Sequence, residues 1–437
     1  MQTATRYSTS IGTRSDEISP PASTMTGGGG ARSPAQAARG RRQKAASLPL
    51  DVLVDIAAHT DPATFVRCAA TCVDMRCRVK EYISLRHPLR LRQGDRFVLP
   101  LLRGHLMYRS HDWSEPKEQL FLMDTSAPDA TKLRTATGGG FPLSSRDGLV
   151  LARVGAAAKE LRVCDPATGR SMTLPPEPAF PRTWGANYVL LVSDDDKGGT
   201  TSVGRHFQVV KAYLNMSEYG GYLHLQFQTF SSEHGAWGLY TETWLPYVQC
   251  GRLKRSLDKA LVTGGAVHWL FMTDTGFYVL KLRVGAAKVM VTKLPKGFPH
   301  HLWEHQKLLA ASSVGGDVLV LVADDDRMSV WAQSKHTAKW KQRPHVVINM
   351  TETILRFLDK EGGGCIPPTK PVGFSLVSFA EKSGTVLIKA CNGFFWLDLR
   401  TMEIVRWFWD HGVPYTTHNI PYEISLTAWV PTFSSTL

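Results

Sequence analysis

Short runs of β-branched, aliphatic and aromatic residues recur along this 437-residue chain from about residue 95 onward, each bounded by Gly, Pro or Asp. The clearest runs are 148–152, 188–192, 207–213, 222–227, 266–271, 277–280, 318–322, 328–331, 385–389 and 394–397. Runs of this length that end at turn residues are typical of β-strands. The pattern therefore predicts an all-β domain over residues 91–437.

Segments of this region resemble one another at a nearly constant spacing. Val163 and Lys281 are 118 positions apart, Lys281 and Asp398 are 117 apart, and each lies in a strand–turn–strand pattern. The similar segments are 161–175, 280–295 and 396–407, and a second pairing matches 189–197 with 319–327. If 117 residues contain two units, each unit has about 55–60 residues, near the upper end of blade lengths in β-propellers. The expected fold is then a β-propeller of about six blades.

A large β-sandwich is the alternative for this region. Sandwiches usually show a turn signal every ~8–12 residues, and the loops between the runs here are longer than that spacing allows. The spacing of the turns therefore favours the propeller.

Residues 47–83 have helical periodicity instead. Pro49 suits the first turn of a helix, and Leu53, Ile56 and Ala57 fall on one face. Asp61-Pro62 stops this helix and begins a second, and a third carries Met75, Val79, Tyr82 and Ile83, so we expect three short helices. Fewer than ~40 residues rarely form a sufficient core. A partner is expected to complete the module.

This segment resembles the F-box, the motif that docks substrate receptors onto the Skp-type adaptor of cullin–RING ubiquitin ligases. Leu48-Pro49, Asp51 and the following aliphatic residues carry the resemblance, whereas Met75-Arg76-Cys77 stands where the family often has an aromatic residue. The adaptor-binding residues that the resemblance implies are Leu48, Pro49, Leu50, Val52, Leu53, Ile56, Val66, Cys68 and Cys72. An ordinary helical hairpin is the alternative. The region after it resembles the β-propeller-like domains that follow F-boxes in plants, particularly grasses, through Gly265–Trp269 and Asp165–Gly169.

The net charge of +13 is concentrated in two segments. Residues 1–47 carry seven Lys or Arg against two acids, and residues 76–109 carry nine against two. Such segments suit nucleic acid or an acidic protein surface, and a solvated helix face is the plain alternative for the second. Because no nucleic-acid motif accompanies them, nucleic acid is not the expected partner. The segment at 76–109 suits an acidic adaptor surface and a solvated helix face about equally.

Residues 1–46 are rich in Ser, Thr, Gly and Arg and are expected to form a disordered basic tail, in which residues 39–44 resemble a nuclear address. The chain shows neither an apolar run of membrane-spanning length nor a secretory signal pattern. The seven cysteines include no C-x-x-C pair, and Cys68, Cys72 and Cys77 are interpreted as buried small hydrophobic residues. These features predict an intracellular protein of the nucleus, the cytoplasm or both, without a membrane partner.

Clusters that suggest chemistry have simpler explanations. Asp194–Asp196 and Asp324–Asp326 are interpreted as acidic hairpin turns, and His300, His301 and His305 as loop residues, so neither a metal nor a cofactor is expected. Nucleophile elbows, phosphate loops and dinucleotide fingerprints are absent from the sequence. Trp237, Trp303 and Trp340 are the candidates for a target-binding surface, because exposed aromatic residues often anchor interfaces.

These observations favour a non-catalytic substrate-recognition subunit of a Skp–cullin–F-box ubiquitin ligase. The helical domain at 47–90 would bind the adaptor and the β domain an unknown target protein. A propeller-type carbohydrate-binding protein or enzyme is the alternative.

Overall fold

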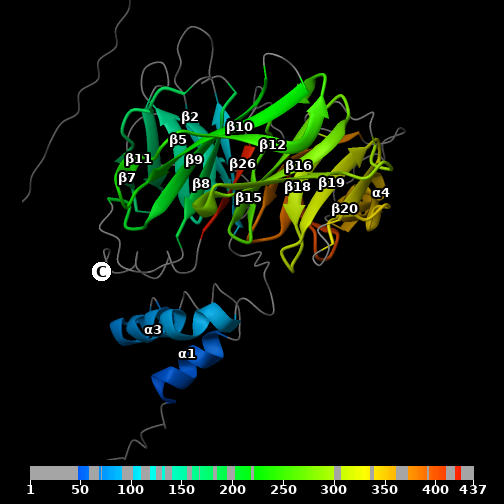
Figure 1. Ribbon diagram of the computed structural model, residues 1–437. Helices are drawn as coiled ribbons and strands as arrows, with labels where there is room; N and C mark the ends of the chain where they lie inside the picture. The colour runs from blue at the N-terminus through cyan, green and yellow to red at the C-terminus, as the bar shows by residue number, and fades with distance from the viewer. Residues whose placement is uncertain are drawn as a thin grey trace, which may run out of the picture. The chain divides into compact units, whose positions relative to one another are not determined.

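The computed structural model describes two groups of elements: helices near the N-terminus and β-sheets in the remainder (Figure 1). The described residues are 48–58, 68–69, 71–90, 102–109, 119–124, 130–132, 140–154, 160–166, 168–180, 185–193, 202–217, 221–299, 307–334, 339–360, 373–390, 393–409 and 419–424. The expected tail at 1–46, Asp61-Pro62, Asp194–Asp196 and the three histidines lie outside these ranges.

The helical module contains α1 (Leu50–Ala58) and α3 (Val73–Arg90). Pro49 directly precedes α1, and its carbonyl accepts hydrogen bonds from the backbone N–H groups of Val52 at 3.0 Å and Leu53 at 3.2 Å. The small core consists of Val54, Ala57, Ala69, Met75 and Val79. The expected apolar face of Leu53, Ile56 and Ala57 is wrong in one position. Ile56 points to solvent, because Leu50, Leu53, Val54 and Ala57 form the inward stripe.

The β domain consists of six antiparallel sheets in the described chain, numbered here in chain order (Figure 1). Sheet 1 contains β26 (Asn419–Glu423), β1 (Leu102–Arg109), β2 (Gln119–Asp124) and β3 (Ala130–Lys132). Sheet 2 contains β4 (Phe141–Arg146), β5 (Leu149–Val154), β6 (Glu160–Asp165) and β7 (Arg170–Thr173). Sheet 3 contains β8 (Asn187–Val192), β9 (Phe207–Met216) and β10 (Gly221–Ser231), with β11 (Ala236–Trp237) and β12 (Thr241–Cys250) both paired to β10.

The other three sheets follow the same plan. Sheet 4 contains β13 (Leu253–Arg255), β14 (Leu261–Thr263), β15 (Ala266–Thr273), β16 (Gly276–Arg283) and β17 (Lys288–Lys293), with a short 3₁₀ helix at Val284–Ala286. Sheet 5 contains β18 (Leu308–Ser312), β19 (Val318–Asp324), β20 (Arg327–Ala332) and β21 (Val346–Asn349). Sheet 6 contains β22 (Phe374–Ala380), β23 (Thr385–Ala390), β24 (Gly393–Asp398) and β25 (Glu403–Trp409).

The sheets are arranged as a β-propeller and not as the two layers of a sandwich. Apolar clusters lie between sheets 1 and 2, 2 and 3, 3 and 4, and 4 to 6, and a further cluster joins sheet 6 back to sheet 1. In addition, β26 near the C-terminus pairs with β1, the first strand of the domain. Each sheet therefore packs against two neighbours, and the chain closes the ring with its own last strand.

The predicted strands and the main repeat are confirmed. The three similar segments form β6–β7, β16–β17 and β24–β25, the last hairpins of sheets 2, 4 and 6, so a spacing of 117 or 118 residues contains two sheets. Two of the three hairpin turns also match, because Gly169 N–H donates to Asp165 O at 2.9 Å and Met402 N–H donates to Asp398 O at 2.8 Å. The β16–β17 turn differs, since it holds the 3₁₀ helix and Ala287 N–H donates to Val284 O at 3.1 Å. Gly169 and Met402 both have positive φ, which makes Gly the easier residue at this position.

The second pairing, of 189–197 with 319–327, is wrong. β8 is the first strand of sheet 3, whereas β19 is the second strand of sheet 5. An apolar run followed by Asp residues occurs at more than one position of a sheet, so this pattern does not identify equivalent strands. Asp325, with a φ of 46°, does lie in the β19–β20 hairpin turn, as the sequence predicts.

Helix α4 (Met350–Lys360) was not predicted. Its N-terminus is capped by Asn349, whose Oδ1 accepts a hydrogen bond from Glu352 N–H at 3.1 Å. Met350, Ile354 and Leu358 form its buried stripe. Both signals were readable in the sequence, as an N-cap followed by apolar residues at i, i+4 and i+8.

Candidate functional site

The helical module presents apolar side chains that its own core does not cover. Leu48, Val52 and Ile56 are 55%, 42% and 53% exposed and are spaced four residues apart. Val52 and Ile56 therefore share one face of α1, opposite the inward stripe, and Leu48 lies four positions ahead of them. We call these three residues the docking stripe.

The other predicted adaptor-binding residues divide between surface and core. Pro49 is exposed, whereas Leu50, Leu53 and Cys68 are half-buried and pack against the module's core. Val66 lies outside the described residues. Cys72 is exposed, and its Sγ accepts a hydrogen bond from Met75 N–H at 3.4 Å at the start of α3.

The interpretation of the cysteine cluster as buried hydrophobic residues is wrong for Cys72 and Cys77, both of which are exposed. The reason is that Met75 and Val79 define the buried face of α3, and neither cysteine lies on it. The basic segment at 76–109 is also not one charged helix face. Arg76 is buried and its Nε donates to Ala69 O at 3.5 Å, and the segment changes from helix to strand between Arg90 and Leu102.

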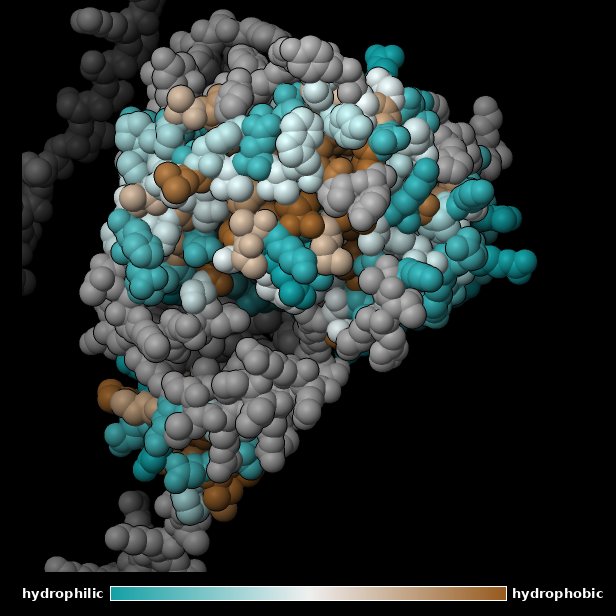
Figure 2. All heavy atoms as spheres, in the orientation of Figure 1, coloured by the Kyte–Doolittle hydropathy of each residue, from teal (hydrophilic) through white to brown (hydrophobic). Residues whose placement is uncertain are grey.

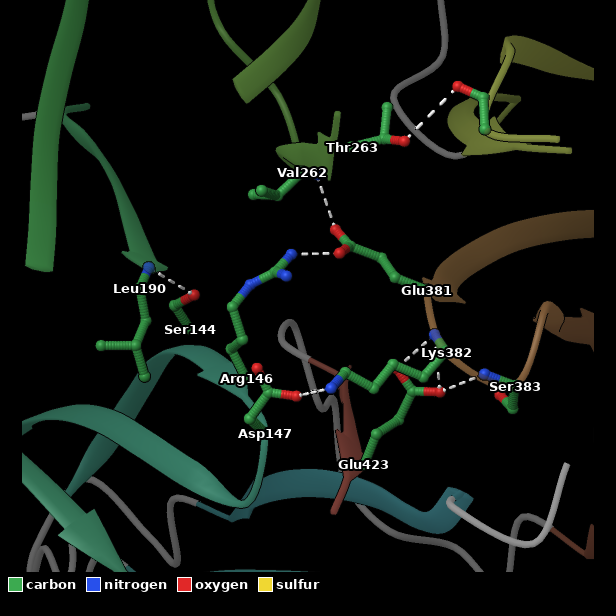
Figure 3. A network of polar contacts seen from close by, with 11 residues as sticks. Ser144, Arg146, Asp147, Leu190, Val262, Thr263, Glu381, Lys382, Ser383 and Glu423 are labelled. Atoms are coloured by element: carbon green, nitrogen blue, oxygen red, sulfur yellow. Dashed lines mark hydrogen bonds and ion pairs between the residues drawn. The ribbon is translucent and has the colours of Figure 1, made fainter. Parts of the chain in front are cut away.

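A central channel runs between the innermost strands of the described β domain. Its volume is about 450 Å³, and it is lined by β4, β8, β14, β18, β22 and β26, one strand from each sheet. This is the geometry of a propeller axis, where the innermost strands surround a common opening. Polar and charged side chains gather where the β4–β5 and β22–β23 turns meet (Figure 3).

Two ion pairs join these turns across the channel wall (Figure 3). Arg146 pairs with Glu381, whose Oε1 also accepts a hydrogen bond from Val262 N–H at 2.7 Å. Lys382 pairs with Asp147. Burial alone would raise the pKa of Asp147, but Lys382 and then Arg146 more than offset it, so this pKa is lowered. The network therefore links sheets 2, 4 and 6.

Glu423 on β26 holds the last strand in place. Its carboxylate accepts hydrogen bonds from Ser383 N–H at 2.7 Å and Lys382 N–H at 3.0 Å, while its backbone carbonyl accepts one from Gly148 N–H at 2.7 Å. Burial raises the pKa of Glu423 despite these bonds. Glu423 and the two ion pairs thus connect the β4–β5 turn, the β22–β23 turn and β26.

The tryptophans predicted to bind a target are placed differently from expectation. Trp340 is 7% exposed and packs in the core, so it is not a surface anchor. Trp237 is half-buried, packs edge-on against Phe230 with ring centroids 5.6 Å apart, and donates from Nε1 to Pro175 O at 3.2 Å. Both side chains pack in the spaces between sheets, where most of the surface of their rings is buried. Trp303 lies outside the described residues.

Among the tryptophans whose burial the structure describes, Trp244 is the exposed one, and sequence analysis did not select it. It is 58% exposed and lies beside Tyr222, which is 54% exposed, with ring centroids 6.4 Å apart. The His224 ring lies 5.2 Å from the Trp244 ring and its Nε2 is 3.3 Å from Glu242 Oε1. Trp244 is therefore held in place by two neighbouring rings while most of its surface faces solvent.

These rings line a shallow groove of about 970 Å³ between β12 of sheet 3 and β17 of sheet 4. On the face seen in Figure 2, apolar side chains gather over β12 and β16. The groove, which we call the aromatic groove, is lined by Tyr222, Trp244, Leu245, Val248, Gln249, Thr275, Tyr278, Val291 and Lys293. A sequence signal for it existed, because Trp244 shares strand parity with Glu242 and so lies on the solvent side of β12.

The described part of the chain shows no group of three or more His, Cys, Asp or Glu side chains arranged to hold a metal ion. Among the same residues, no helix combines the length and the apolar character that crossing a membrane requires.

The fold and these surfaces define a β-propeller domain that follows a small helical module. A model of the family described as "Domain of unknown function (DUF7595)" matches residues 122–405. Because this match covers more than half of the chain, the chain belongs to that family. The matched residues lie within the β domain, and α1 and α3 precede them.

Solved structures give remote matches. The chain is similar to a protein from Lactobacillus plantarum at 12% identity, over 70% of this chain and 82% of that chain, with a TM-score of 0.38. It is similar to TolB from Acinetobacter baumannii at 11% identity, over 77% and 72%, with a TM-score of 0.36, and to the Dos1 propeller at 12%, over 66% and 63%, with a TM-score of 0.31. No curated protein matches the chain. These comparisons assign no function.

Proposed function

We propose that this protein is the substrate-recognition subunit of a Skp–cullin–F-box ubiquitin ligase, in the nucleus, the cytoplasm or both. The helical module, which resembles an F-box, binds the Skp-type adaptor, and the β domain holds a target protein. The chain itself performs no bond chemistry. It acts by proximity, because a tethered target meets the ubiquitin-loaded enzyme at a high effective concentration.

The docking stripe is the observation that carries this proposal. Val52 and Ile56 expose apolar surface on a helix whose opposite face already packs against Met75 and Val79. The described core of the module is small, with five buried apolar residues, so the module gains stability when a partner covers Leu48, Val52 and Ile56. An apolar helix face that docks into a groove is a common mode of recognition.

The β domain supplies the second half of the proposal. We infer that each of the six sheets is one blade, with β26 completing the first blade and closing the ring. A closed ring is a rigid platform for a binding surface. The aromatic groove is the surface that we assign to the target, because Trp and Tyr anchors dominate the binding energy of many interfaces.

The test is a binding measurement between the full chain and a recombinant Skp-type adaptor. The double variant V52D/I56D places two charges on the docking stripe, so we expect adaptor affinity to fall by about tenfold or more. Leu48→Ala with Pro49→Ala is expected to weaken it less. Isothermal titration calorimetry gives the affinities, and circular dichroism checks the helices.

The matched control is L239D, because Leu239 is an apolar residue that is 91% exposed in the β domain. This variant should bind the adaptor as the unmodified protein does. If V52D/I56D and L239D bind the adaptor equally well, the docking stripe is not the adaptor-binding surface. If the unmodified chain does not bind the adaptor at all, the proposed ubiquitin-ligase function is wrong.

A propeller-type carbohydrate-binding protein is the second candidate, and the exposed rings of Tyr222 and Trp244 favour it. Aromatic faces with nearby polar groups such as Gln249 and Lys293 also suit sugars. Glycan binding that is lost in W244A and unaffected by V52D/I56D would support this candidate over a protein target.

A further inference from the structure

We propose that the central channel binds a small carboxylic acid with an apolar body, whose carboxylate pairs with Lys259. This inference concerns a site separate from the docking stripe and the aromatic groove, and it does not depend on the ubiquitin-ligase proposal.

The charges around the channel are the first observation. The charged residues that line it are Arg146, Asp147, Asp258, Lys259, Glu381, Lys382 and Glu423. Arg146 pairs with Glu381, Lys382 pairs with Asp147, and Asp258 pairs with the adjacent Arg255. Glu423 accepts hydrogen bonds from two backbone N–H groups. Within the described part of the chain, Lys259 is the one lining charge without a partner.

Lys259 is an unusual place for an unpaired charge, because its surroundings disfavour the charged form. Its side chain meets the solvent of the channel, yet the protein surrounds that space, so desolvation and then repulsion from Arg255 lower its pKa to about 8. A cation whose charged form is penalised in this way is stabilised by an anion placed beside it. Its neighbours supply none, because the Asp258 carboxylate is already paired with Arg255.

The backbone before Lys259 is fixed in place. Asn187 Nδ2 donates to Asp258 O at 2.9 Å, which ties this segment to sheet 3. Asp258 N–H donates to Leu270 O at 3.4 Å within sheet 4. Lys259 therefore belongs to an anchored segment that lines the channel. Because the backbone is already ordered, ligand binding does not have to order it.

The apolar residues that line the channel indicate what the uncharged part of the ligand is like. Leu143, Val189, Leu257, Ala260, Leu308 and Leu376 are among the residues that line the cavity. A volume of about 450 Å³, with these apolar residues beside the charged ones, suits a small molecule that carries both an apolar and a charged part. Inorganic anions would leave these walls bare, so an acid with a hydrocarbon or aromatic body fits better.

The channel wall also contains buried polar atoms without a hydrogen-bond partner in the described chain, Ser378 Oγ and Asn419 Oδ1 among them. The two residues are only 2% and 7% exposed. Buried polar atoms normally find a partner. Phosphate is a poorer candidate, since it usually requires Arg clusters or several backbone N–H donors.

The experiment uses the full chain and three probe acids: butyrate, octanoate and 4-hydroxyphenylacetate, each with its neutral amide. We expect at least one acid to bind in calorimetry and its amide to bind about tenfold more weakly. The variant K259M should lose about tenfold in affinity, K259R should retain most of it, and K288M, an exposed lysine on β17, should bind normally.

The pH dependence provides a second readout. The acids stay ionised throughout, so affinity should fall severalfold between about pH 7 and about pH 9 as Lys259 loses its proton, and K259M should show no such fall. If none of the three acids binds at millimolar concentration, or if K259M matches the unmodified protein in affinity and pH profile, the proposed site is wrong. K259R keeps the test valid if K259M does not fold.

Discussion

The helical module and the β domain solve the problem of burying apolar residues in opposite ways. In the β domain, apolar clusters join neighbouring sheets around the ring, and Trp269 and Trp396 are fully buried. In the described part of the module, five apolar residues form the core while Leu48, Val52 and Ile56 remain on the surface. The contrast predicts that the β domain is stable alone, whereas the module gains stability from a partner.

The largest effect is expected from W269A in the β domain. Trp269 is fully buried between sheets 3 and 4, and its Nε1 donates to Asn187 Oδ1 at 2.8 Å. Removing the ring leaves a cavity and an unpaired amide, so the free energy of unfolding should fall by about 3–5 kcal/mol. Urea denaturation followed by fluorescence measures this.

The partner experiment sharpens the comparison. V54A in the module should lower stability by less, and added adaptor should restore it, because a ligand that binds only the folded module stabilises it by mass action. The adaptor should leave the deficit of W269A unchanged. Rescue of both variants, or of neither, would contradict the division into a self-sufficient domain and a partner-dependent module.

The sequence predicted these two regions unequally well. The strands were readable because short apolar runs and the turn residues that bound them are local properties. The two-sheet repeat was readable because similar hairpin segments recur at a nearly constant spacing. The exposed surfaces could not be predicted, because the exposure of a side chain depends on which face of its strand packs against a neighbouring sheet. Trp340 packs in the core, whereas Trp244 is exposed. The sequence also could not show that Lys259 lines the channel, because this depends on the arrangement of all six sheets around it.

A medium effect is expected from H105F, at the contact between sheets 1 and 6. His105 is fully buried against Phe394 and Phe408, and neither ring nitrogen has a hydrogen-bond partner in the described chain. Phe removes an unsatisfied polar ring, so we expect stability near neutral pH to be equal or greater by about 1 kcal/mol.

The same variant has a signed pH dependence. Burial lowers the pKa of His105 from 6.5 to about 3, so the unfolded chain binds a proton that the folded protein excludes. The stability that neutral His105 provides is present above about pH 6.5 and is lost as the pH falls toward about 3. The advantage of H105F should therefore grow on acidification, which thermal denaturation at several pH values measures. A constant difference between the two proteins across that range would contradict the assignment.

The smallest effect is expected from D51N in the module. Asp51 forms an ion pair with Arg78 at 3.4 Å, but the two side chains are 70% and 49% exposed, and Arg78 also pairs with Glu81 at 3.2 Å. Solvent and salt screen such a pair, so the change in unfolding free energy should be about 0–1 kcal/mol and should shrink further at high salt. Adaptor affinity measured in parallel gives the informative result. If D51N weakens adaptor binding far more than it lowers stability, then Asp51 contacts the partner, and the docking stripe extends from apolar residues to the acidic residue beside them. If both effects are small, the apolar residues alone account for docking, and the module depends on its partner through buried area rather than through charge.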